Sequence, residues 1–261
     1  MKRFPAKLLL FGEYTVINGG SALAIPFSKY SGCWKQQEQS SLIPFFEYLK
    51  TLNGCDESLI DQAIKQNWVF ASDIPLGYGL GSSGSLSAAA YDAFFTLKTT
   101  ELLNLKNLLA EIESYFHGKS SGLDPLTSYT NKAVHIEIGQ INTIAPSPLP
   151  EQLTLYDSGI PRNGKPFIKY YLDRLELDKT FYKIVSTLSK LNKCIIREFV
   201  NGEDVSQSFF EISSLQYEFF QNMIPEAVLK DWKRGLDSGQ YAMKLSGAGG
   251  GGYFLRWDAS T

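Results

Sequence analysis

The sequence predicts a mixed α and β fold in two parts that meet near residue 148. Short runs of β-branched and aromatic residues alternate with longer segments of helical spacing. Three prolines fall within Ala145–Pro150, and proline ends regular structure. The length of 261 residues, 44% of them hydrophobic, suits two domains of ordinary size. We therefore expect one domain over residues 1–148 and a second over 149–261.

The chain is expected to begin with a β-hairpin. Lys7–Ile17 is rich in Leu, Phe, Tyr and Val and is interrupted near Gly12-Glu13. A turn at Asn18-Gly19-Gly20 precedes a second apolar run, Ser21–Pro26. Beyond the hairpin, residues 41–52 and 56–66 have helical spacing, and Trp68–Ser72 has the composition of a strand.

The rest of the first part is predicted to be mainly helical. A helix over Leu86–Phe95 follows a glycine-rich segment. Glu101–Phe116 carries apolar residues at 102, 105, 109, 112 and 116, which form one stripe along a helix. A short helical or looped stretch follows Pro125, and Ala133–Ile138 is a predicted strand.

The second part is expected to open and close with strands and to be helical between them. Leu153–Tyr156 is the opening strand, and Tyr241–Leu245 and Tyr253–Trp257 are the closing pair. The segments with helical spacing are 166–176, 179–200, 205–221 and 225–237.

Composition narrows the functional classes. The formal net charge of -2 and a pI near 5.8 provide no broad basic surface, so we expect a small-molecule substrate and no nucleic acid. Three cysteines without close spacing and two histidines form neither a disulfide framework nor a zinc pattern, which suits a reducing cytoplasm. The apolar start is cut short by Glu13, and no run reaches the roughly 18 residues of a membrane span. We therefore expect a cytoplasmic protein with no membrane partner.

The glycine-rich segment Pro75–Ser85 is the most informative stretch of the chain. Glycines let a backbone approach an anion closely, and the helix that follows directs the positive end of its dipole at the same place. The segment is therefore a candidate phosphate cradle. A flexible surface loop before an ordinary helix is the plain alternative, since serine also caps helices.

Other phosphate motifs fit this segment less well. Gly79–Gly84 spells G-x-G-x-x-G, with Glu101 downstream, but residues 73–76 separate it from the strand that a dinucleotide loop should leave directly. No lysine precedes Ser82 or Ser83, which excludes a Walker loop. A protein-kinase loop is excluded because Leu86 stands in place of valine and no H-R-D or D-F-G motif follows.

A second glycine-rich segment, Gly247–Gly252, lies near the end of the chain. Five glycines in six positions destabilise a regular element by about 1 kcal/mol each relative to alanine. Such a composition indicates a backbone that must come close to another group, with a mobile hairpin tip as the alternative.

Three segments together resemble the GHMP kinases, the family that includes galactokinase, homoserine kinase, mevalonate kinase and phosphomevalonate kinase. They are Pro5–Tyr14, Pro75–Ser83 and Lys244–Gly252, and their order and spacing agree across nearly the whole chain. The resemblance implies an α+β fold of two domains with the active site in the cleft between them. It also implies an ATP- and Mg²⁺-dependent kinase that acts on a small molecule, as a monomer or homodimer.

A fourth segment, His117–Pro125, is similar to the mevalonate kinase pattern H-G-x-P-S-G-x-D. By this match Asp124 is the expected catalytic base, which takes the proton of the acceptor hydroxyl. Lys7 matches the lysine beside that base, where a cation keeps the carboxylate ionised and polarises the hydroxyl. We expect His117 itself to be structural, since the family's chemistry already has its carboxylate.

The resemblance also assigns the binding residues. Glu113 and Ser83 match the family's magnesium ligands, which are hard oxygen donors. Glu13 and Tyr14 fall beside the substrate. The expected nucleotide-binding residues are Gly79, Leu80, Gly81, Ser82, Ser83 and Gly84 in the first glycine-rich segment and Gly247, Ala248, Gly249 and Gly250 in the second.

The chain departs from the mevalonate kinase pattern in ways that bear on the acceptor. Tyr14 replaces the usual histidine, Ser120 replaces a proline and Gly84 replaces an alanine, and the chain is short between its first two motifs. Mevalonate or a similar hydroxy acid is the leading acceptor. Phosphomevalonate is the alternative, for which Lys119, Arg162 and Lys165 would supply charge, although Arg162 matches only loosely and is left out of the site. The third alternative is a catalytically inactive relative of the family that only binds a nucleotide or a metabolite.

Overall fold

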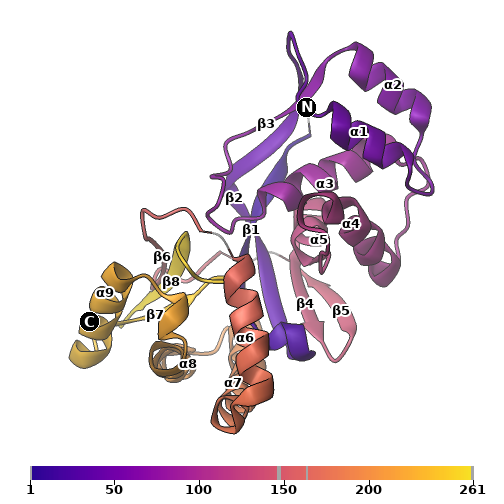
Figure 1. Cartoon of the computed structure of the whole chain (residues 1–261). Coiled ribbons are helices and arrows are strands. Elements are labelled where there is room, and N and C mark those ends of the chain that lie inside the picture. The colour runs from indigo at the N-terminus through magenta and orange to yellow at the C-terminus, as the bar shows by residue number, and fades with distance from the viewer. Residues whose placement is uncertain (1, 146–147, 163, 260–261) are drawn as a thin grey trace.

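The computed structural model describes residues 2–145, 148–162 and 164–259, without the side chain of Lys165. Its first half is built on a five-stranded antiparallel sheet in the order β1-β2-β4-β5, with β3 paired to the far end of β2 (Figure 1). The strands are β1 (Phe4–Phe11), β2 (Ala22–Gln36), β3 (Trp68–Ser72), β4 (Ala133–Glu137) and β5 (Gln140–Ile144).

Helices α1 to α5 cover one face of this sheet (Figure 1). The central one is α3, whose residues from Gly84 to Tyr91 are all buried because they are small or apolar and pack against α4, α5 and β1. The helices are α1 (Ile43–Lys50), α2 (Glu57–Lys65), α3 (Ser82–Phe94), α4 (Leu102–His117) and α5 (Leu123–Thr130).

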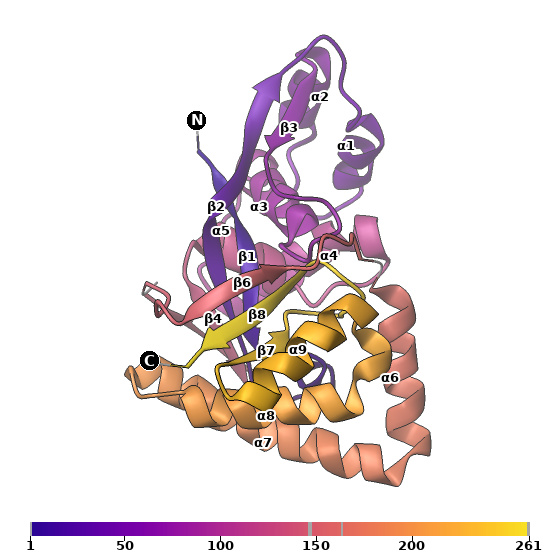
Figure 2. The same ribbon diagram turned by 90° about the vertical axis from the view of Figure 1, so that its left-hand side faces the viewer.

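The second half combines a small sheet with helices α6 to α9 (Figure 2). Its strands run antiparallel in the order β6-β8-β7, and α8 and α9 pack on β7. The strands are β6 (Leu153–Asp157), β7 (Tyr241–Leu245) and β8 (Tyr253–Asp258). The helices are α6 (Lys165–Leu177), α7 (Lys179–Asn201), α8 (Ser206–Phe219) and α9 (Glu226–Ser238).

Strand β1 contributes residues to both hydrophobic cores, and every one of its residues is buried. Ala6, Leu8 and Leu10 belong to a cluster that continues into the second half, whereas Phe4 and Leu9 belong to the cluster beneath the first-half helices. A functional side chain on β1 is therefore held from both sides, next to the place where the halves meet.

The mixed α and β fold and most of the predicted elements are confirmed. The first strand ends at Phe11, next to the predicted interruption at Gly12-Glu13, and a 3₁₀ turn follows at Thr15–Asn18, so the prediction that the strand continues to Ile17 was wrong. Other boundaries also differ, since β2 continues past Pro26 to Gln36 and α3 begins at Ser82 rather than Leu86. Strand β5 was not predicted. The division at residue 148 stays a prediction, and residues 146 and 147 of the predicted linker lie outside the described residues.

Strand β5 escaped notice because its turn lacks the usual composition. Ile138 and Gly139 both have positive φ, 47° and 74°, as a two-residue hairpin turn requires. A β-branched residue rarely adopts that conformation, so Gly139 is the one usual turn residue at these two positions. In the described part of the chain, no helix has the length and apolar composition needed to cross a membrane.

Candidate active site

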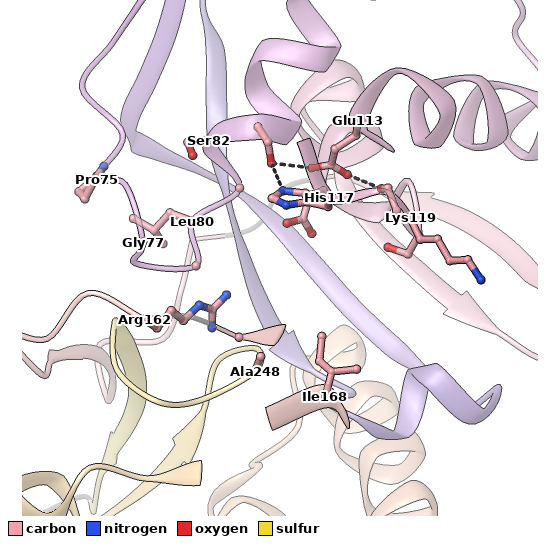
Figure 3. Close-up of a pocket in the computed structure, with 17 residues that line it drawn as sticks. Pro75, Gly77, Leu80, Ser82, Glu113, His117, Lys119, Arg162, Ile168 and Ala248 are labelled. Carbon is pink, nitrogen blue, oxygen red and sulfur yellow. Dashed lines mark hydrogen bonds between the residues drawn. The ribbon is translucent and has the colours of Figure 1, made fainter. Parts of the chain in front are cut away.

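A pocket of about 530 Å³ lies where the first glycine-rich segment faces the second half of the chain (Figure 3). Four elements of the first half reach it: this segment, the start of α3, the end of α4 and the start of α5. The lining residues are Pro75, Gly77, Gly79, Leu80, Gly81, Ser82, Ser83, Glu113, His117, Lys119, Ser120, Ser121, Asp124, Arg162, Gly164, Ile168 and Ala248.

The first glycine-rich segment presents the start of α3 to this pocket. Gly81 is the residue before the helix, has a φ of 69° and provides no side-chain cap. The first N–H groups of an α-helix have no acceptor within the helix and carry its positive dipole end. Ser82 and Ser83, the first helical residues, line the pocket at this point. The arrangement suits a bound phosphate group.

Lys7 and Asp124 form an ion pair at the pocket. The Lys7 ammonium nitrogen lies 2.9 Å from Asp124 Oδ2, with the lysine side chain 5% exposed and the aspartate 29%. Lys7 Nζ also donates to the carbonyl oxygen of Gly79 at 3.3 Å, and the Lys7 backbone N–H donates to that of Leu80 at 2.9 Å. Strand β1 and the glycine-rich segment therefore fix the position of the ammonium group.

Two glycines leave space for Asp124, which lies in the first turn of α5. A Cβ atom added to Gly81 would lie 3.3 Å from Asp124 Oδ2. One added to Gly84 would lie 2.8 Å from the Cβ of Asp124 and 2.9 Å from the nitrogen of Pro125. The start of α3 and the start of α5 are thus packed backbone to backbone, which brings the carboxylate beside the phosphate cradle.

Glu113 is a buried carboxylate at the same pocket. It is 4% exposed and accepts hydrogen bonds from Ser83 Oγ at 2.9 Å on Oε1 and from Ser120 Oγ on Oε2. Burial, and then the negative charge of Asp124, raise the pKa of Glu113 to about 7, while the two hydroxyls act in the opposite direction. Ser83 Oγ also lies 3.0 Å from His117 Nε2.

These groups fit a magnesium ion that is shared with a phosphate ligand. Magnesium takes one or two protein carboxylates and leaves its other positions to water and substrate phosphates. Glu113 and Ser83 provide two oxygen donors side by side, and a cation would offset the burial of the carboxylate. No group of three or more His, Cys, Asp or Glu side chains is placed to hold a metal within residues 2–145, 148–162 and 164–259.

Arg162 reaches the pocket from the second half, although the sequence left it out of the site (Figure 3). Its NH1 donates to the carbonyl oxygen of Ser246 at 3.1 Å. The guanidinium group lies against both glycine-rich segments, since a Cβ atom would be 2.3 Å away at Gly79 and 2.6 Å away at Gly247. Burial lowers its pKa, and Asp124 acts in the opposite direction. In the sequence, the position of Arg162 in a loop after a predicted strand was the only indication that it could belong to the site.

The second glycine-rich segment contributes less of the lining than expected. Ala248 lines the pocket, whereas Gly247, Gly249 and Gly250 are absent from its lining. Gly250 lies beneath the ring of Phe167, since a Cβ there would be 2.2 Å from the ring, and its N–H donates to the carbonyl oxygen of Met223. These glycines allow close packing inside the second half.

Glu13 and Tyr14 lie behind the pocket rather than along it. Glu13 is paired with Lys244, with Oε1 2.5 Å from Nζ. The Tyr14 hydroxyl donates to the carbonyl oxygen of Ala248 at 2.6 Å, and its ring packs against Tyr171 and Phe220. Both residues therefore connect the N-terminal segment to the second half, and contact with a substrate stays a prediction.

A second, mainly apolar cavity of about 460 Å³ adjoins the first. The two cavities share Ser82, Ser83 and His117. The apolar lining comes from the residue before α1, from β3 and the segment after it, and from α3 and α4. It consists of Leu42, Val69, Phe70, Ile74, Leu76, Leu86 and Phe116. A ligand with an apolar ring and a phosphate tail would fit across both cavities.

Comparison with known proteins points to one family. Residues 47–132 match the family model described as the GHMP kinases N terminal domain. A mevalonate kinase of Pyrococcus abyssi is 24% identical over 289 aligned positions, which cover 95% of this chain and 85% of the relative. A mevalonate kinase of Thermococcus gammatolerans is 27% identical over 180 positions, which cover 56% of this chain and 54% of the relative. The chain thus aligns with about half the length of that second relative.

Solved structures agree on the fold. The mevalonate kinase of L. major in complex with R-mevalonate has a TM-score of 0.66 at 16% identity and covers 99% of this chain and 87% of its own. The phosphomevalonate kinase of Streptococcus pneumoniae in complex with phosphomevalonate and AMPPNP has a TM-score of 0.70 at 14% identity, covering 100% and 92%. The resemblance that the motifs predicted is confirmed.

Proposed function

We propose that the chain is a GHMP kinase that transfers the γ-phosphoryl group of ATP to a hydroxyl group of mevalonate or a similar hydroxy acid. The observation that carries this proposal is the Lys7–Asp124 ion pair of 2.9 Å, placed in one pocket with the start of α3 and the carboxylate of Glu113. A base, a phosphate cradle and a metal-binding carboxylate are the parts that phosphoryl transfer needs.

In the proposed reaction, Asp124 accepts the proton of the acceptor hydroxyl as its oxygen bonds to the γ-phosphorus. The bond from that phosphorus to the bridging oxygen breaks, ADP leaves, and Asp124 returns the proton to solvent. Lys7 holds Asp124 in place through their contact of 2.9 Å and offers positive charge to the reacting oxygen. Mg²⁺, held by Glu113 and Ser83, would neutralise charge on the phosphates.

The two adjoining cavities support a place for each part of the nucleotide. We assign the phosphates to the cradle at Gly79–Ser83 and the adenine ring to the apolar cavity beside it. The shared residues Ser82, Ser83 and His117 would then lie between the ring and the phosphates. Apolar walls with a few polar groups are the usual lining of such a ring site.

Arg162 supports an anionic acceptor. Its guanidinium group enters the pocket near Asp124 and donates from NH1 to the carbonyl oxygen of Ser246. Because a guanidinium group carries several N–H donors, it can keep this contact and still bind an anion. Carboxylate and phosphate groups each match its planar pair of donors. Mevalonate satisfies this requirement with its carboxylate.

Phosphomevalonate is the second candidate acceptor, favoured by Lys119, which is exposed on the same pocket. Lys119 would then bind one of the two anionic groups of phosphomevalonate, and Arg162 would bind the other. Lys165, the third residue considered for this role, has a side chain outside what the structure describes.

ADP release by the purified protein with ATP and Mg²⁺ tests these assignments. We expect turnover with mevalonate to exceed turnover with phosphomevalonate, galactose or homoserine. Faster turnover with phosphomevalonate would transfer the assignment to the second candidate. Tight ATP binding with no ADP release from any acceptor would overturn the kinase proposal and favour a silent nucleotide-binding relative.

A further inference from the structure

Ser120 occupies a place in the pocket where the mevalonate kinase pattern has proline. Its Oγ donates to Glu113 Oε2 and accepts a hydrogen bond from the N–H of Gly122 at 2.9 Å. One hydroxyl therefore connects the loop before Asp124 to the buried carboxylate on α4. A proline at this position has no side-chain donor and could not make the contact with Glu113.

The orientation of Glu113 depends on this hydrogen bond. Glu113 lies in the fourth turn of α4 and is 4% exposed, so little water is available to solvate it. Ser83 donates to Oε1 at 2.9 Å and Ser120 donates to Oε2. With both oxygens held, the carboxylate plane is fixed. Loss of one donor leaves a buried oxygen unsatisfied and frees the group to rotate.

We infer that Ser120 is a positioning residue that orients the Glu113 carboxylate for a divalent metal ion. This inference rests on the proposed function, because Glu113 is a metal ligand only under that proposal. Groups that hydrogen-bond to a metal ligand typically change metal affinity by about 10- to 100-fold when they are removed. We expect an effect at the lower end of that range, since Ser83 still holds the other oxygen.

The competing explanation is that Ser120 only shapes its loop. Its oxygen accepts from the N–H of Gly122 two residues further on, which is a local turn contact. A purely local role would alter the stability of the protein when the hydroxyl is removed, and the metal affinity would stay unchanged. Metal affinity is therefore the readout that separates the two roles.

The test is a titration of the full chain with Mn²⁺ in the presence of a non-hydrolysable ATP analogue, with free Mn²⁺ measured by electron paramagnetic resonance. Ser120→Ala and Ser120→Pro remove the donor, and Ser120→Thr keeps it. Thr99→Ala is the matched control, because Thr99 Oγ1 accepts from the N–H of Glu101 at 3.2 Å, a local turn contact of the same kind at a residue that does not line the pocket. Circular dichroism confirms that each variant is folded.

We expect Mn²⁺ to bind about 10-fold more weakly to Ser120→Ala and Ser120→Pro than to the parent protein. Its affinity for Ser120→Thr and Thr99→Ala should stay within about 2-fold of that for the parent. Equal affinity in the parent and Ser120→Ala would overturn this inference and leave the proposed function in place. If the parent and its nucleotide complex bind no Mn²⁺, both the metal site and this inference fail. A folded Ser120→Thr that binds as weakly as Ser120→Ala would also overturn it.

Discussion

The ammonium group of Lys244 lies 2.5 Å from the carboxylate of Glu13, and both side chains are completely excluded from solvent. Lys244 Nζ also donates to the carbonyl oxygens of Leu10 at 2.7 Å and Leu245 at 2.8 Å. Glu13 follows β1, and Lys244 lies on β7 just before the second glycine-rich segment. The ion pair therefore joins the two halves of the chain behind the pocket.

We predict that Glu13→Gln destabilises the protein by roughly 3–5 kcal/mol, because it leaves the buried Lys244 charge without its partner. Urea unfolding measures the loss. The double variant Glu13→Leu/Lys244→Met should lose less than the sum of the single variants, since it buries no charge. Parental stability of Glu13→Gln, together with a large rise in KM for the acceptor, would instead support the substrate-binding role expected from the sequence.

The Lys7–Asp124 ion pair leads to a prediction about turnover. Asp124→Asn should lower kcat by at least about 100-fold, the lower limit for the loss of a general base. ATP affinity should change little, because the cradle at the start of α3 remains. Lys7→Met should also lower kcat, and the double variant should lose less than the product of the two effects, since both residues act on one proton. Full activity of Asp124→Asn would remove it from the mechanism.

The sequence predicted the fold and the residues of the candidate site better than it predicted the contacts between those residues. Helical spacing located nearly every helix, and apolar runs located nearly every strand, because both patterns reflect burial in the core. Ser83, Glu113 and Asp124, which the resemblance singled out, line one pocket, and Lys7 is paired with Asp124 there. Their roles stay predictions.

Sequence patterns did not predict the contacts between segments that are distant in the chain. Arg162 enters the pocket only because the loop after β6 folds back onto Gly77, whose carbonyl oxygen accepts from the Arg162 N–H at 2.8 Å. Glu13 pairs with a lysine 231 residues away. The sequence shows Ser120 only as a replacement for proline, and its hydrogen bond to Glu113 depends on the folded structure.

Gly84 provides a third prediction, because the family pattern has alanine at this position. Alanine favours a helix by about 1 kcal/mol over glycine. In this fold, however, its Cβ would lie 2.8 Å from the Cβ of Asp124 and 2.9 Å from backbone atoms of residues 124 and 125, so α5 must shift. We expect Gly84→Ala to lower kcat about 10-fold or more, as a displaced base would, with KM for ATP nearly unchanged. Parental kcat would show that α5 adapts freely.

The pKa of Glu113, raised to about 7 chiefly by burial, predicts how stability depends on pH in the metal-free protein. An unfolded glutamate has a pKa near 4.5, so between the two values the folded state binds more protons than the unfolded state. The contribution of Glu113 to the free energy of unfolding is complete below the pKa of the unfolded state. It is lost as the pH rises through the pKa of the folded state, by up to about 3 kcal/mol. Urea unfolding in chelator at several pH values should show this loss in the parent and not in Glu113→Gln. Parallel curves for both would mean that Glu113 titrates normally.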